Sequence, residues 1–79
     1  MAYDHYAEAS RLAKRLAEEG HGEWTRRIEA VIAEGATANE ILMGLRWQLE
    51  RLARSDVALS HEAADESKLL LRELKRVLA

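Results

Sequence analysis

Residues 37–54 read TANEILMGLRWQLERLAR, and this stretch decides the fold. It opens with a capping box, in which the Thr37 hydroxyl can accept the amide of Glu40 while the Glu40 carboxylate reaches back to the amide of Thr37. Apolar side chains then recur every three or four positions, the spacing of one helix face: Ile41, Leu42, Leu45, Leu49 and Leu52. The stretch therefore predicts an amphipathic helix that ends near Arg54.

The same spacing predicts three more helices, at about residues 3–19, 23–34 and 60–79. Gly20 and Gly35 follow the first two as stop signals, and Gly20 is expected to be left-handed. Ser60 is the favoured cap of the last helix, with Asp56 as the alternative. The expected core residues of these helices are Tyr6, Ala9, Ala13 and Leu16, with Leu12 and Ala17 at the edges; Trp24, Ile28, Val31 and Ile32; and Ala63, Ser67, Leu70, Leu74 and Val77, with Leu71 and Leu78 widening the face.

Short connections between the predicted helices favour antiparallel neighbours. We therefore expect an all-α fold, a small four-helix bundle of antiparallel helical hairpins formed by residues 1–79 as a single domain. The second helix is shorter than the others, which leaves a three-helix core with one helix packed across it as the alternative.

Composition narrows the classes of function. Hydrophobic residues make up 48% and charged residues 33% of the chain, and the formal net charge is −2 with interspersed signs. This balance argues against electrostatic capture of nucleic acid or of an anionic membrane. No apolar run approaches the ~20 residues of a membrane span, and the start of the chain lacks the apolar block of a signal peptide. Because cysteine is absent, disulfides and thiolate metal sites are excluded, and we expect a cytoplasmic protein.

Histidines are the candidate metal ligands. His21 and His61 fall at the same end of the predicted bundle, with Glu23 near the first and Asp65 one turn after the second. These residue types bind Zn²⁺, but no His-x-x-x-His pair is present, and helix ends collect polar side chains in any case. His5 is expected at the edge of the core. The serines lack a His and acid partner at a telling spacing, so we expect no enzyme, no metal and no cofactor, and no small-molecule ligand is evident.

Residues 30–41, AVIAEGATANEI, carry an apolar helix, a glycine turn and a threonine-capped helix. This stretch resembles the first part of the helix-turn-helix of LuxR-type transcription regulators, and the resemblance implies DNA binding through the second and third helices. In that family a second turn and a recognition helix follow. Here residues 46–51 continue the helix, so the part that reads the major groove is missing, and no Lys or Arg precedes Arg46 in this helix.

The back of the third helix carries an apolar spot. At 100° per residue, Met43 and Trp47 point almost opposite to the Leu stripe, flanked by Glu50 and Arg54. Gly44 lies to one side, where it would let another backbone approach closely. Tryptophan and methionine are enriched at the cores of protein interfaces, so Met43, Gly44, Trp47 and Arg54 form the candidate interface.

These residues lead to a functional hypothesis. We expect a small protein-protein interaction or assembly module that forms a homodimer through the back of the third helix. A binder of a different protein, of the immunity or antitoxin type, is one alternative, and a DNA-binding regulator is another. Coverage of Met43 and Trp47 within the monomer, by the loop at residues 57–59, would remove the candidate interface.

Overall fold

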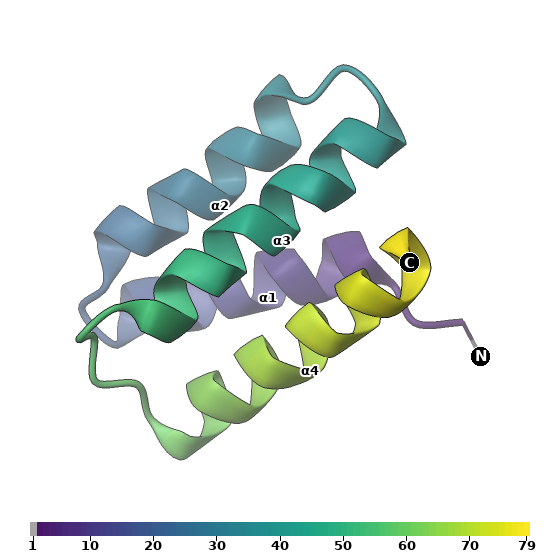
Figure 1. The fold of residues 1–79 in the computed structure, drawn as a ribbon. Helices are drawn as coiled ribbons and strands as arrows, with labels where there is room; N and C mark the ends of the chain where they lie inside the picture. The colour runs from purple at the N-terminus through teal and green to yellow at the C-terminus, as the bar shows by residue number, and fades with distance from the viewer. Residues whose placement is uncertain (1) are drawn as a thin grey trace.

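The computed structural model describes residues 2–79, which form four helices: α1 (His5–Glu18), α2 (Gly22–Glu34), α3 (Ala38–Arg54) and α4 (His61–Leu78). Helices that follow one another run antiparallel (Figure 1). Each helix packs against two neighbours, in the ring α1–α2–α3–α4–α1. The predicted all-α four-helix bundle is therefore confirmed, and the alternative of a three-helix core with one helix across it is not what forms.

Side-chain caps set the beginnings of three helices, and the sequence predicted two of them, those at Thr37 and Ser60. The Asp4 carboxylate accepts the amide of Ala7 at 3.0 Å, so α1 begins at His5 rather than at Tyr3. Thr37 caps α3 by accepting the amide of Glu40 at 3.1 Å. The Glu40 carboxylate meets the Thr37 hydroxyl at 3.4 Å, in place of the backbone amide that a full capping box would use.

The two glycines that follow α1 and α2 end their helices in different ways. Gly20 has φ +88°, the left-handed conformation that the sequence predicts and that glycine adopts without strain. Gly35 is the C-cap of α2, which confirms it as the stop signal, but its φ of −69° and ψ of 132° are extended rather than left-handed. Glycine is needed there for space, because a Cβ at this position would overlap the side chain of Ile41.

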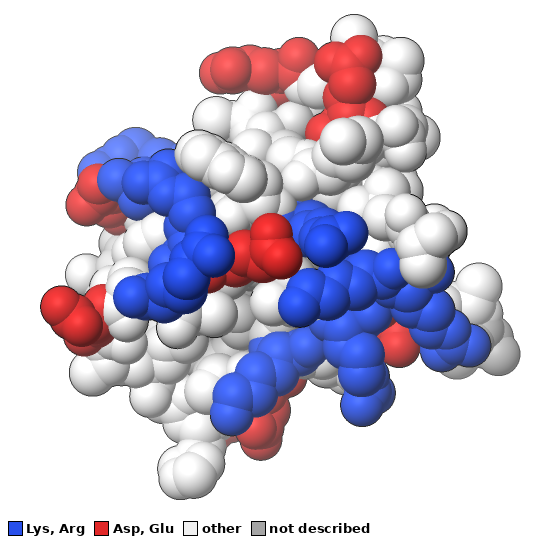
Figure 2. All heavy atoms as spheres, viewed as in Figure 1, with Lys and Arg blue, Asp and Glu red and all other residues white. Residues whose placement is uncertain are grey.

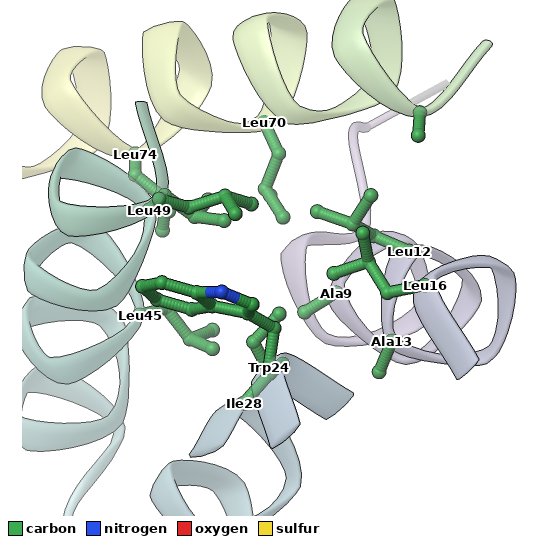
Figure 3. Packing of buried hydrophobic residues seen from close by; sticks show 12 residues of the cluster. Ala9, Leu12, Ala13, Leu16, Trp24, Ile28, Leu45, Leu49, Leu70 and Leu74 are labelled. Carbon is green, nitrogen blue, oxygen red and sulfur yellow. The ribbon is translucent and has the colours of Figure 1, made fainter. Parts of the chain in front are cut away.

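The core lies along the axis of the bundle, and every helix contributes to it (Figure 3). Leu12 is fully buried and central, whereas Tyr6 (37% exposed) and Ala17 turn outward, so α1 is rotated slightly from the predicted stripe. Val77 is 52% exposed in the last turn of α4, which corrects its expected place in the core. The buried apolar residues are Ala9, Leu12, Ala13, Leu16, Trp24, Ile28, Leu45, Leu49, Leu52, Ala63, Leu70 and Leu74.

Two polar side chains are buried with this core, and the sequence pattern singles out one of them. Ser67 lies on the predicted stripe of α4 and is buried. Thr25 of α2 was not predicted: its hydroxyl donates to the carbonyl of Ala13 at 2.6 Å, which joins α2 to α1. Within residues 2–79, no helix combines the length and the apolar character that crossing a bilayer requires.

Candidate protein-contact surface on α3

Met43 and Trp47 lie one turn apart on the side of α3 that faces away from the core. Their residues are 55% and 54% exposed, while Leu45 and Leu49 of the same helix are buried at 0% and 1%. The 3.6-residue period of the helix separates the two sets, because positions 43 and 47 fall on the opposite side from 45 and 49. We call the exposed Met43 and Trp47, together with the flanking charged residues Glu40 and Arg54 on the same side, the outer stripe of α3.

A shallow hollow of about 410 Å³ lies beside the outer stripe, between α3 and the last turn of α4. Leu78, which sequence reasoning assigned to the core face, forms its far wall. Asn39 and Arg46 were also not predicted as site residues, although the period of α3 places both beside Met43. Only Leu78 is brought to the hollow by the placement of α4 beside α3. The hollow is lined by Asn39, Met43, Arg46, Trp47, Glu50 and Leu78.

Neighbouring side chains hold the two apolar residues in place. The Arg51 guanidinium stacks over the Trp47 ring, 4.7 Å from its centroid, and covers one face of the indole. Asn39 Nδ2 donates to Met43 Sδ at 3.4 Å. Contacts of this kind are individually weak, but they restrict the rotamers of both side chains. An apolar surface that is already ordered loses less entropy when a partner covers it.

Gly44 faces α2 rather than a second molecule. A Cβ at this position would lie 2.8 Å from Cγ1 of Val31, closer than real Cβ atoms approach. The close approach that the sequence predicted is therefore made inside the chain, and by a side chain instead of a backbone. Gly44 is therefore not part of the outer stripe.

The loop between α3 and α4 leaves the outer stripe exposed. Val57 and Leu59 of this loop are partly buried against the core, and Met43 and Trp47 keep more than half of their area in solvent. Arg54, the remaining predicted interface residue, is exposed at the end of α3. The expected alternative, in which this loop covers the apolar spot, does not occur.

Charge is distributed unevenly around this surface. Figure 2 shows acidic side chains at the end of the molecule where α2 ends and α3 begins, and basic side chains over the second half of α3 and over α4. The sequence explains part of this gathering, because α3 carries Arg46, Arg51 and Arg54 late, and α4 carries Lys68, Arg72, Lys75 and Arg76 late. Basic residues near a helix C-terminus also suit the helix dipole.

At the end of the bundle that holds His21 and His61, hydrogen bonds join the connection between α1 and α2 to the loop between α3 and α4. His21 Nε2 lies 3.1 Å from the carbonyl of Ala58. The Glu19 carboxylate accepts hydrogen bonds from the hydroxyl (2.6 Å) and the amide (3.2 Å) of Ser60. Both bonds stabilise the charged carboxylate and lower the pKa of Glu19 below its ordinary value, and the bond from the hydroxyl has the larger effect. Among residues 2–79, no three acidic or histidine side chains are placed to hold a metal ion.

Ser60 also confirms the favoured cap of the last helix. Its hydroxyl oxygen accepts the amide of Ala63 at 3.1 Å while the same hydroxyl donates to Glu19. His5 lies half-buried at the core edge, as predicted, with Nε2 3.4 Å from the carbonyl of Glu73. The link to Glu19 was missed by sequence reasoning, because 41 residues separate it from Ser60 and no local pattern connects them.

Comparison with known proteins does not assign the chain to a family. No protein-family model, curated protein or solved structure matches the chain. The functional argument therefore depends on the geometry of the molecule.

Proposed function

We propose that this chain is a small helical protein-protein interaction module, and that it associates with a second copy of itself through the outer stripe of α3. The single observation that carries the proposal is the exposure of Met43 (55%) and Trp47 (54%) side by side on one helix. Isolated exposed apolar residues are common on proteins. An ordered Trp-Met pair beside a hollow, with a polar rim, is the typical composition of an interface core.

Small size supports self-association. A chain of 79 residues buries a smaller fraction of its surface than a larger domain does, so covering more apolar area against a partner adds usefully to its stability. The rim residues Arg46 and Glu50 are paired with each other at 3.6 Å, so covering the hollow would not require burial of a lone charge there.

Sedimentation over a range of protein concentrations tests the proposal. We expect the wild type to form a dimer in the micromolar range and Trp47→Ala to remain monomeric at matched concentrations. Tyr6→Ala is the control, because Tyr6 is an aromatic residue of α1 that is also partly exposed (37%). A wild type that stays monomeric at high micromolar concentration would contradict the homodimer.

The second candidate is a different protein as partner, as in immunity or antitoxin proteins. The basic side chains over α3 and α4 (Figure 2) favour an acidic partner for this case. Its test is binding of a purified acidic partner to the wild type and to Trp47→Ala, with the chain itself monomeric. DNA binding is supported less well, because the exposed start of α3 carries Asn39 and Glu40 rather than basic residues.

A further inference from the structure

The outer stripe of α3 is self-complementary in charge. Glu40 lies seven residues before Trp47, and Arg54 lies seven residues after it. Seven residues are almost two full helical turns, so all three side chains fall on the same side of α3, with the charges about 10 Å from Trp47 along the axis in each direction. The stripe therefore reads acid, apolar, base, with Trp47 midway between Glu40 and Arg54. The exposed Arg51, one turn after Trp47, is a second base in its late half.

Both end charges are available for a partner. Glu40 and Arg54 are exposed, and neither takes part in an ion pair among the described residues 2–79. The helix dipole favours an acid early and a base late on any helix. It does not favour their equal distance from an exposed tryptophan, nor their position on the one side of α3 that no other helix covers.

We infer that two copies of this chain dock antiparallel through α3, with Trp47 on the two-fold axis and Glu40 of each copy against Arg54 of the other. A two-fold axis through Trp47 exchanges positions 40 and 54, so the contact forms two identical ion pairs around a pair of indoles. Parallel docking would instead bring Glu40 against Glu40 and Arg54 against Arg54, which like-charge repulsion opposes.

This inference rests on the proposed self-association and adds its orientation. It also fits the wider charge distribution, since antiparallel docking brings the acidic end of one copy near the basic second half of α3 in the other (Figure 2). Sedimentation tests the self-association, and a separate cross-linking experiment tests the orientation of the two copies.

Cysteine cross-linking tests the orientation cleanly, because the chain has no cysteine of its own. We would prepare Glu40→Cys and Arg54→Cys, and treat each variant alone and an equal mixture of both with a short bismaleimide. We expect a cross-linked dimer in the mixture and no cross-linked dimer in either variant alone. In the mixed dimer the two cysteines face each other, and the remaining Glu40 still faces the remaining Arg54, so one of the two ion pairs is kept. Ser10→Cys, on the exposed side of α1, mixed with Arg54→Cys gives the background from random collision.

Each other outcome decides against the inference. Cross-linking of either variant with itself above the background would show parallel docking. A mixture that cross-links no more than the Ser10→Cys control, at concentrations where the wild type sediments as a dimer, would overturn the antiparallel contact and leave the homodimer standing. A wild type that is monomeric would remove the proposed self-association itself, and the inference with it.

Discussion

Replacing Gly44 by alanine tests whether this glycine serves the inside of the bundle. On an isolated helix this change is favourable by about 1 kcal/mol, because glycine is the poorer helix former. Here the new Cβ would lie 2.8 Å from Cγ1 of Val31, with Cγ2 and Cβ of Val31 at 3.6 and 3.7 Å. Valine in a helix has one strongly preferred rotamer, so the contact is relieved mainly by moving α2 away from α3.

The magnitudes decide the sign of the effect. Overpacking of this kind costs about 1–3 kcal/mol, against the gain of about 1 kcal/mol in helix propensity. We expect Gly44→Ala to lower the free energy of unfolding by roughly 0–2 kcal/mol, with each 1 kcal/mol lowering Tm by about 4–8 °C in a domain of this size.

A double-mutant cycle isolates the contact with Val31. We would measure denaturant unfolding of the wild type, Gly44→Ala, Val31→Ala and the double variant. In the Val31→Ala background the added methyl has room, so Gly44→Ala should there be stabilising by about 1 kcal/mol. A gain of that size in the wild-type background as well would refute the reasoning. The proposed dimer should sediment unchanged in Gly44→Ala if the tertiary fold is kept, because Gly44 faces α2.

Three further outcomes follow from the structure. Trp47→Ala should weaken the proposed dimer and leave Tm almost unchanged at concentrations where the wild type is also monomeric. The exposed 54% of a ~250 Å² side chain is about 135 Å², or ~3 kcal/mol per copy at 25 cal/mol/Å². Covering half of this area in both copies therefore corresponds to about a hundredfold change in Kd, measured by sedimentation. Glu19→Gln should remove part of the acid sensitivity of unfolding: the folded pKa is below the ordinary 4.5, so this stabilisation is present above pH 4.5 and is lost as pH falls through the folded pKa. Equal slopes of Tm against pH between 7 and 3 in both proteins would contradict it. Thr25→Val should lower the free energy of unfolding by about 1 kcal/mol, because the hydrogen bond to the Ala13 carbonyl is lost at a buried site; an unchanged denaturation midpoint would show that the bond contributes nothing.

Local sequence signals were sufficient to predict the helices and most of their ends. The hydroxyls of Thr37 and Ser60 cap α3 and α4, and Gly20 is left-handed. Caps and glycine stops depend on residues within one turn, so their chemistry can be read without knowing the tertiary fold. The orientation of α3 was predictable for a similar reason, since its Leu stripe is long and unbroken.

The errors arise where a residue's surroundings are set by another helix. Tyr6 and Val77 belong to apolar stripes but lie near helix ends, beyond the region that neighbouring helices cover. Thr25 is buried because the carbonyl of Ala13 lies opposite it, and no spacing in the sequence indicates that partner. Gly35 is required by the side chain of Ile41, which reaches it only after the chain has turned into α3.

The candidate site was predicted in outline and completed by tertiary structure. Helical geometry places Met43 and Trp47 on the side of α3 opposite the Leu stripe. Their exposure also required the loop at residues 57–59 to pack against the core, which the sequence did not decide. The hollow beside them needs Leu78 of α4, and the true neighbour of Gly44 is Val31 of α2. These relations depend on how far each helix sits from the next, which the hydrophobic pattern does not specify.

The bonds that join Glu19 to Ser60 and His21 to the carbonyl of Ala58 tie the two corners at one end of the bundle together. At the other end, α1 approaches α4 through the longer 3.4 Å contact between His5 and Glu73. Transient opening of the native state should accordingly begin at the end where His5 lies against Glu73. Amide protons with an intrahelical acceptor in the first half of α4 should exchange with deuterium more slowly than those in its last turns.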